Sequence, residues 1–244
     1  NMDTNKYVEM ITTYPSKNVH TSFFTDADGD LILPDVLPLG NYRIEEVAAP
    51  FGYVLNENYV EVKVDTDTFY EVDPDTYEAI ITVEYENAPA VGELIIEKKG
   101  EVLDAYKGGL FADSEDKEFV YKEGSLAGAK FEIYAAEDIY TADMQTDENG
   151  NRNKYYAEGD LVATVVTGED GKAKVSDLPL GKYRVVEVEA PYGYVLNKEE
   201  QYVTFVYVDD KTPVIRESLT FANDRQKVDL SVAKLDGETG LPVS

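Results

Sequence analysis

The sequence of 244 residues contains no cysteine and no tryptophan, and its single histidine is His20. Without cysteine there is no disulfide framework, no thiolate metal site and no cysteine nucleophile. One histidine also excludes a histidine-based catalytic triad and a zinc site with several histidine ligands. No apolar run approaches the roughly 18 residues that a membrane-spanning helix needs. We therefore expect no metal, no cofactor and no membrane insertion for this segment.

Positive charge is also scarce. The sequence has 22 Lys and Arg against 49 Asp and Glu, which gives a formal net charge of −27 at pH 7. Such a chain repels nucleic-acid phosphates and anionic membrane surfaces, so neither is an expected partner. Apolar residues still make up 43% of the sequence and aromatic residues 11%, which is enough for folded cores. The acidic charge is therefore that of a folded surface rather than of a disordered tail.

The strongest pattern is an internal repeat. Residues 37–56 read LPLGNYRIEEVAAPFGYVLN and residues 178–197 read LPLGKYRVVEVEAPYGYVLN, with 15 of 20 positions identical. Two shorter pairs follow at an offset of 136 residues, YENAP with FANDR and GELIIEKK with VDLSVAKL. Chance does not produce such a set of matches, so we interpret the chain as a tandem array.

The repeat predicts three modules, of which one is whole. Residues 1–89 form a module that lacks its N-terminal strand or strands, residues 90–226 a complete module, and residues 227–244 the first strand of a third. Within the complete module, the charged and weakly patterned stretch near 100–124 predicts a long exposed loop or hairpin. The chain is thus expected to be a window on a longer array.

The local pattern is that of an all-β protein. Short segments rich in β-branched and aromatic residues are bounded by Gly, Pro, Asp and Asn, as in 181–188, 201–208 and 217–223. Turn signals such as DADGD and DENGN recur between them, and we interpret these as β-turns rather than calcium loops. The pattern also allows one short helix around 135–144. Strands at this spacing imply a β-sandwich or a barrel.

Alternation along the strands puts a polar residue at the end of three apolar rows, because successive side chains point to opposite faces. In the complete module the rows are Leu94, Ile96 and Lys98; Tyr183, Val185 and Glu187; and Leu219, Phe221 and Asn223. The partial copies give Tyr42, Ile44 and Glu46; Ile81, Val83, Tyr85 and Asn87; and Leu230, Val232 and Lys234.

A buried trio of this kind is chemically reactive. A charged Lys or Glu buried alone is very costly, and burial favours the neutral form of each. A neutral amine is a nucleophile, a neutral carboxylic acid moves protons, and an Asn carboxamide is an electrophile that releases ammonia. Held together, the three can form a Lys–Asn amide cross-link, one irreversible turnover per module. The ordinary alternative is a lysine that extends to solvent and an asparagine that hydrogen-bonds to nearby backbone.

The same residues carry a family resemblance. The LP-LG-xYRVxExxAPxGY stretch, GAKFEIY at 128–134, a first strand ending in Lys and a last strand ending in F-x-N together resemble the Cna B-type, SpaA-like repeat domains of Gram-positive pilins and adhesin stalks. The resemblance covers nearly the whole chain, and residues 232–244 look like the opening of another such domain. It implies tandem prealbumin-like, Ig-like β-sandwich domains.

The resemblance also implies residue roles, because many members carry an intramolecular Lys–Asn isopeptide bond promoted by a Glu. Transferred to the complete module, Lys98 is the nucleophile, Asn223 the amide acceptor and Glu187 the promoting acid. In the first, partial module Glu46 is the equivalent of Glu187.

Two further residues are orphan partners. Asn87 matches the acceptor, but the lysine of its module would lie before the first residue, and Lys6 follows no apolar alternating row. Lys234 opens a third module whose Glu and Asn lie beyond the sequence. An alternative is that Lys234 completes the open first module of another copy.

The resemblance implies a structural function rather than an enzymatic one. We expect a stalk or backbone repeat of an extracellular, cell-wall-anchored adhesin or pilin, with signal peptide and anchor outside this segment. Adjacent modules of the same chain are expected partners, with a host extracellular-matrix or cell-surface ligand for an adhesin. The alternative is that the modules themselves bind a host protein or glycan, through a Tyr-rich strand face or the stretch near 100–124.

Overall fold

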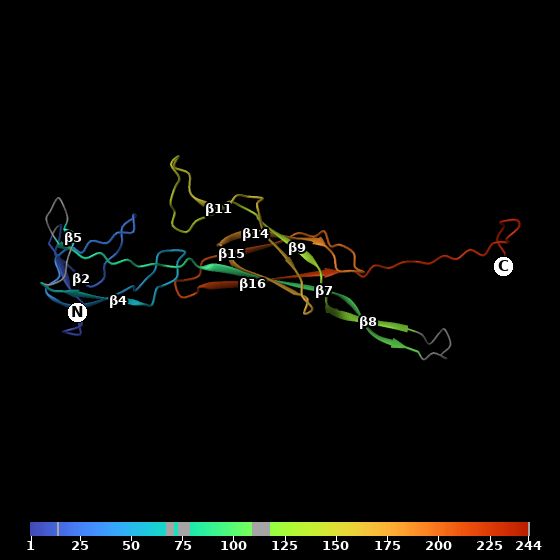
Figure 1. Cartoon of the computed structure of the whole chain (residues 1–244), viewed down its shortest axis with the longest axis horizontal. Coiled ribbons are helices and arrows are strands. Elements are labelled where there is room, and N and C mark those ends of the chain that lie inside the picture. The colour runs from blue at the N-terminus through green and yellow to red at the C-terminus, as the bar shows by residue number, and fades with distance from the viewer. Residues whose placement is uncertain (14, 67–70, 73–78, 109–117, 244) are drawn as a thin grey trace. The chain divides into compact units, whose positions relative to one another are not determined.

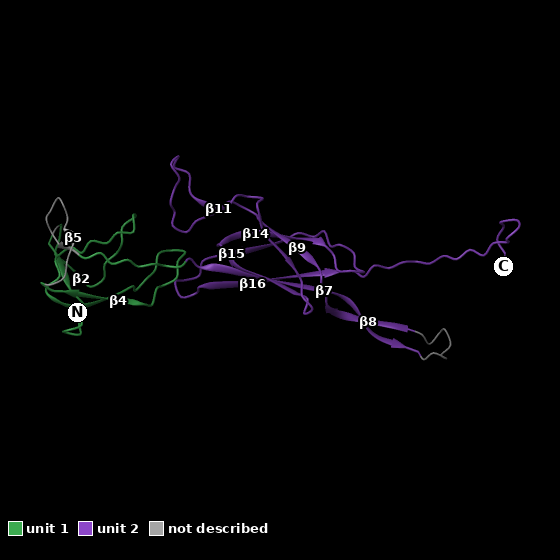
Figure 2. Cartoon of the chain, viewed as in Figure 1, with its two compact units in different colours: residues 1–88 green, residues 89–244 purple. Residues whose placement is uncertain are grey.

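The computed structural model describes the chain apart from residue 14 and residues 67–70, 73–78, 109–117 and 244. The described residues form strands, turns and loops (Figure 1). They divide into two compact units, unit 1 at residues 1–88 and unit 2 at residues 89–244 (Figure 2). No helix in this described part is long and apolar enough to cross a membrane.

The described residues of unit 1 form three antiparallel strand pairs. These are β1 (Met10–Thr12) with β2 (Asn18–His20), β3 (Gly40–Glu45) with β4 (Tyr59–Val64), and β5 (Glu71–Val72) with β6 (Ala79–Ile80). The side chain of Tyr42 on β3 is 4% exposed and its hydroxyl donates to the carbonyl of Pro38 at 2.7 Å. Tyr183 of unit 2 makes the same bond to Pro179 at 2.7 Å, which explains the repeated LPLG-x-Y segment.

The last strand predicted for unit 1, the one that would end in Asn87, is not formed. The segment 81–88 has no strand partner among the described residues, although Val83, Tyr85 and Asn87 are half-buried and the residues between them exposed. The alternation predicted from the sequence is therefore present, but the ladder hydrogen bonds are not. In unit 2 the last strand pairs with the first strand. No described strand of unit 1 occupies the position of that first strand, so the segment 81–88 has no partner.

Unit 2 is a sandwich of two sheets. One sheet has the order β12-β9-β14-β15, and the other has β13-β7-β16 with β8 added to the far part of β7. A separate short pair joins β10 to β11. The strands are β7 (Val91–Lys107), β8 (Glu118–Ser125), β9 (Lys130–Ala135), β10 (Ile139–Tyr140), β11 (Lys154–Tyr156), β12 (Leu161–Val166), β13 (Lys172–Leu178), β14 (Gly181–Glu189), β15 (Gln201–Phe205) and β16 (Val214–Asn223).

The core of unit 2 lies between these two sheets, where alternate side chains of each strand meet. Aromatic rings fill its centre, with the ring centroids of Phe131 and Phe221 4.9 Å apart and those of Tyr183 and Phe205 5.9 Å apart. Burial raises the pKa of the Tyr183 hydroxyl above its ordinary value. This packing confirms the all-β sandwich predicted from the sequence.

The first and last strands of unit 2 lie side by side. β16 pairs with β7 in parallel, and the register places Phe221 opposite Lys98 and Asn223 opposite Gly100. Because the two strands are parallel, the chain enters unit 2 at one end and leaves it at the other. Residues far apart in sequence, at the start and the end of the module, are thereby neighbours.

The short helix that the sequence allows around 135–144 is not formed. Residues 139–140 instead form β10, which pairs with β11, and Ile139 is 1% exposed in the core. The carboxylate of Asp138 accepts hydrogen bonds from the Glu158 amide and the Lys154 amino group, both at 2.9 Å. These bonds link the segment around residue 138 to residues 154–158. A helix here would give up these contacts across the chain.

The stretch near 100–124 forms a hairpin arm, defined here as residues 101–108 and 118–124, and residues 109–117 lie outside the described part. β7 runs on past the sandwich and pairs with β8 (Figure 1). The rings of Tyr106 and Phe119 stand opposite each other with centroids 5.1 Å apart, and both side chains are at least half exposed. The exposed hairpin predicted from the charge pattern is present in the described residues.

Gly92 on β7 gives a direct test of the packing. A Cβ at this position would come within 2.4 Å of the Phe205 ring. We expect Gly92→Ala to destabilise unit 2 by about 1–3 kcal/mol, because overpacking forces side chains or backbone to move. Thermal unfolding of the full chain measures this loss. Gly168→Ala is the matched control, because its Cβ would lie 3.4 Å from the nearest atom, so an equal effect of both changes would contradict the packing described.

Candidate functional site

Lys98 lies inside the sandwich. Leu94, Ile96 and Lys98 follow one face of β7 and all three side chains are fully buried, as the alternation predicted. The amino group of Lys98 lies 5.6 Å from the ring centroid of Phe131 and 5.8 Å from that of Phe221. Burial lowers the pKa of Lys98, and its contact with Glu187 partly opposes this effect. The environment thus increases the fraction of neutral, nucleophilic amine.

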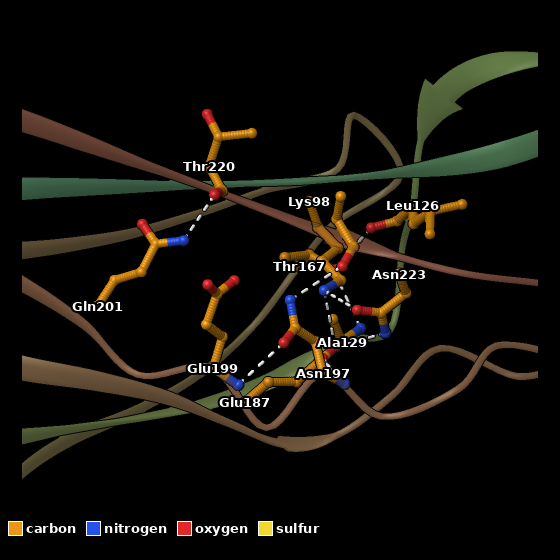
Figure 3. A network of polar contacts seen from close by, with 11 residues as sticks. Lys98, Leu126, Ala129, Thr167, Glu187, Asn197, Glu199, Gln201, Thr220 and Asn223 are labelled. Atoms are coloured by element: carbon orange, nitrogen blue, oxygen red, sulfur yellow. Dashed lines mark hydrogen bonds and ion pairs between the residues drawn. The ribbon is translucent and has the colours of Figure 1, made fainter.

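Glu187 reaches Lys98 from the opposite sheet. One carboxylate oxygen, Oε1, lies 3.1 Å from Nζ of Lys98 and accepts a hydrogen bond from Nδ2 of Asn223 at 3.0 Å. Nζ of Lys98 also donates to Oδ1 of Asn223. The structure therefore brings together the three residues singled out in the complete module, and Figure 3 shows them converging. The side chains of Lys98 and Glu187 have no exposed surface at all.

A fourth residue holds the carboxylate in place. The backbone amide of Asn197 donates to Oε2 of Glu187 at 2.9 Å, and its side-chain amide donates to the carbonyl of Ala222 at 3.0 Å, beside Asn223 (Figure 3). Asn197 was not identified from the sequence. The available signal was that it ends the 20-residue repeat, where Asn56 is its counterpart.

The described residues of unit 1 contain a similar Asn–Glu pair, with no lysine in contact with it. Nδ2 of Asn87 donates to Oε2 of Glu46 at 2.7 Å, and the amide of Asn56 donates to the same oxygen at 2.7 Å. Asn87 also donates to the carbonyl of Val54 at 3.0 Å. No lysine takes part in these contacts among the described residues, so the acceptor half of the site stands alone.

The other lysines considered lie elsewhere. Lys6 is exposed, and hydrogen bonds join its backbone to that of Asn1. Lys234 is exposed in the C-terminal segment, where its carbonyl accepts from the amide of Val243 at 3.0 Å. Neither meets an Asn–Glu pair in the way that Lys98 does.

The acidic segments 26–30 and 147–151 form turns. Oδ1 of Asp26 accepts the amides of Asp28 and Asp30 at 3.0 Å, and Asp147 accepts those of Asn149 and Asn151 at 2.8 and 2.9 Å. Within the part of the chain that is described, no group of three or more His, Cys, Asp and Glu side chains could hold a metal ion.

The fold and the site define a class of protein. Two facing sheets, with parallel first and last strands and a buried Lys, Glu and Asn between them, describe a prealbumin-like β-sandwich. The family model of the SpaA prealbumin-like fold domain matches residues 6–77 and 117–217 of this chain. The chain belongs to this family, and the resemblance to Cna B-type, SpaA-like domains is confirmed.

Individual relatives have low sequence identity to this chain. The trypsin-resistant surface T6 protein of Streptococcus pyogenes is 27% identical over 147 residues, which are 59% of this chain and 25% of that protein. The Bacillus anthracis TIE protein matches 89% of this chain and 30% of that structure, with 25% identity and a TM-score of 0.49. A minor pilin of Streptococcus agalactiae matches 73% of this chain and 68% of its own, with 18% identity and a TM-score of 0.34. The chain thus spans about a quarter of the length of its curated relative.

Proposed function

We propose that the chain is a structural stalk or backbone segment of a Gram-positive cell-wall-anchored surface protein, an adhesin or a pilin, and that unit 2 is held closed by an autocatalytic Lys98–Asn223 isopeptide bond. Residues 1–89, 90–226 and 227–244 are, in this proposal, a partial, a complete and an opening domain of the array. The protein acts outside the cell, and the proposed reaction joins two of its own side chains rather than converting a separate substrate.

The observation that carries the proposal is the buried contact of Lys98 with both Glu187 and Asn223. Two ionisable groups without exposed surface are costly to keep as charges. The same groups become useful if the lysine is consumed in a neutral amide. A module stabilised by ordinary packing alone would not require these three polar side chains in its core.

The proposed reaction is a condensation. Glu187 takes a proton from the Lys98 ammonium, and the neutral Nζ attacks Cγ of Asn223. A new Cγ–Nζ bond forms, the Cγ–Nδ2 bond breaks, and the Nδ2 group leaves as ammonia with a proton returned through Glu187. One lysine amine and one carboxamide give one secondary amide and one ammonia, so no co-reactant is required. Asn197 holds the carboxylate that moves the protons, and the two phenylalanine rings exclude water.

The bond would suit a stalk that is exposed to force and proteases. It joins β7 to β16, the two strands through which the chain enters and leaves unit 2. Tension along the chain would then cross a covalent bond rather than a ladder of hydrogen bonds. The name of the streptococcal relative, a trypsin-resistant surface protein, is consistent with such a module.

Tryptic digestion of the denatured chain tests the proposal. An isopeptide-linked Lys98 is no longer a cleavage site, so we expect a branched peptide that joins residues 64–99 to residues 217–225. Its mass should equal the sum of the two peptides less about 17 Da for ammonia. Recovery of these segments as separate, unmodified peptides, with cleavage after Lys98, would contradict the proposed bond.

A further inference from the structure

The loop that follows β14 recurs almost unchanged in both units. Residues 191–197 read PYGYVLN in unit 2, and residues 50–56 read PFGYVLN in unit 1. We call residues 191–197 the clasp loop, because it is bonded to the chain on either side of Asn223. Three hydrogen bonds make this connection: the Val195 amide to the Asp224 carbonyl at 2.9 Å, the Gln226 amide to the Gly193 carbonyl at 2.8 Å, and the Asn197 side chain to the Ala222 carbonyl at 3.0 Å.

The clasp loop also contacts the other two strands of the site. The backbone amide of Asn197 donates to Oε2 of Glu187 at 2.9 Å, so the same loop holds the acid and the end of β16. Tyr194 reaches β7, where its hydroxyl donates to the carbonyl of Glu101 at 2.6 Å, three residues beyond Lys98. The three strands that carry the reacting side chains therefore meet at one loop.

Gly100 makes room for the Tyr194 ring. It follows Lys98 in the buried row of β7 and lies opposite Asn223 in the register of β7 and β16. A Cβ at this position would come within 2.7 Å of the carbonyl oxygen of Asn223 and 3.0 Å of Cε1 of Tyr194. The ring of Tyr194 thus occupies the place of the next side chain in the row after Lys98.

Arg225 holds the chain just beyond Asn223. Its guanidinium carbon lies 3.9 Å from the ring centroid of Tyr121 on the hairpin arm, and its Nε lies 3.8 Å from the carboxylate of Glu101. An isolated antiparallel bridge also pairs Arg225 with Tyr194. Glu101 therefore contacts Tyr194 through its carbonyl and Arg225 through its carboxylate. A shift of β16 along β7 would break both contacts.

We propose that Tyr194 is a positioning residue for the condensation of Lys98 with Asn223, an inference that rests on the bond proposed above. The Cγ–Nζ bond forms, the Cγ–Nδ2 bond breaks and ammonia leaves, with Glu187 moving the protons. Tyr194 takes no proton in this step. By linking β7 to the clasp loop, its hydroxyl keeps Nζ within reach of Cγ, and a misplacement of about 1 Å costs roughly a hundredfold in rate. Burial raises the pKa of the Tyr194 hydroxyl, so it stays a hydrogen-bond donor at neutral pH.

The rate of condensation in Tyr194→Phe tests this inference. The substitution removes the hydroxyl and keeps the ring beside Gly100. The full chain is made by cell-free translation, samples are stopped in denaturant at intervals, and linear and cross-linked chains are distinguished by the mass difference of about 17 Da. We expect Tyr194→Phe to condense roughly ten- to a hundredfold more slowly than the unsubstituted chain.

Tyr53→Phe is the matched control, because Tyr53 has the same place in the repeat of unit 1. Its amide donates to the Pro50 carbonyl at 3.0 Å, as the Tyr194 amide donates to the Pro191 carbonyl at 3.1 Å. The control should condense at the rate of the unsubstituted chain. Equal slowing in both variants would show that the effect does not come from the contact of Tyr194 with Glu101, and would overturn the inference.

A stability measurement distinguishes positioning from folding. In Lys98→Met no bond can form, so thermal unfolding of this variant with and without Tyr194→Phe measures what the hydroxyl contributes to the fold alone. We expect both chains to be folded at the temperature of the rate measurement, so that the slower condensation occurs in folded molecules. A double variant that is unfolded at that temperature would overturn the positioning role, because slow condensation would then follow from loss of the fold.

The remaining outcomes separate this inference from the proposal on which it rests. Equal rates for Tyr194→Phe and the unsubstituted chain would overturn the role of Tyr194 and leave the Lys98–Asn223 bond standing. An unsubstituted chain that stays at its full sequence mass at all times would overturn the bond itself.

Discussion

Replacing Glu187 by Gln is expected to abolish the cross-link and leave the chain at the full mass of its sequence. The substituted amide keeps the size of the side chain and an oxygen for the Asn197 amide, which donates to the native carboxylate at 2.9 Å. It cannot take a proton from Lys98 and return one to the leaving ammonia. Loss of a positioned proton-transfer group typically costs about 10²–10⁴-fold in rate, so bond formation should be undetectable on the timescale of purification. Intact mass spectrometry of the denatured variant measures the result.

Glu46→Gln is the matched control for this change. Glu46 holds Asn87 and the Asn56 amide as Glu187 holds Asn223 and the Asn197 amide, but in unit 1 it has no lysine partner among the described residues. The control should therefore leave the loss of one ammonia in unit 2 unchanged. An ammonia loss that survives in Glu187→Gln would mean that another group moves the protons, and the role assigned to Glu187 would be wrong.

Replacing Lys98 by Met is expected to cause a large loss of stability without disturbing the packing. Met is unbranched and apolar, so it fits the space between Phe131 and Phe221, and the Glu187 carboxylate keeps its hydrogen bonds from the Asn197 amide and the Asn223 side chain. The bond would join positions 125 residues apart, and the chain-entropy treatment of such a closed loop gives about 5 kcal/mol of stabilisation. We expect the midpoint of thermal unfolding to fall by roughly 15 °C for a domain of this size. Digestion by trypsin should become faster although one lysine has been removed.

Lys99→Met controls for the change of residue type. The Lys99 side chain points away from the core, is 40% exposed, and lies 3.9 Å from Glu123 on the hairpin arm. A surface pair of this kind contributes little to stability. We expect the midpoint of Lys99→Met to stay close to that of the unsubstituted chain. Equal midpoints for Lys98→Met and Lys99→Met would contradict a covalent contribution from Lys98.

Strand alternation explains why the site could be found from the sequence. The period of two along a strand is rigid, so the buried positions of Leu94 and Ile96 fix the side on which Lys98 lies. The same alternation, which recurs in the partial copies, indicates the second and third rows, which end in Glu187 and Asn223. What alternation could not supply was the pairing of the rows, because it depends on the parallel register of β7 and β16. That register came only with the resemblance and the structure.

The features that the sequence did not predict depend on contacts between distant segments. The stretch 135–144 carries helix-compatible residues, but burial of Ile139 and the bonds of Asp138 override local preference. Asn197 acts mainly through its backbone amide, which nearly every residue type possesses. The residue type at position 197 therefore did not indicate this role. The segment 81–88 has the pattern of a strand and is not one in unit 1, because a strand needs a partner as well as a pattern.

The most direct measurement is the intact mass of the purified, unsubstituted chain as a denatured monomer. The geometry of Lys98, Glu187 and Asn223 predicts a mass lower than that of the 244-residue sequence by about 17 Da, the ammonia released by one amide condensation. A monomer at the full sequence mass would contradict the central claim, because it would mean that the buried lysine and asparagine lie in contact without reacting.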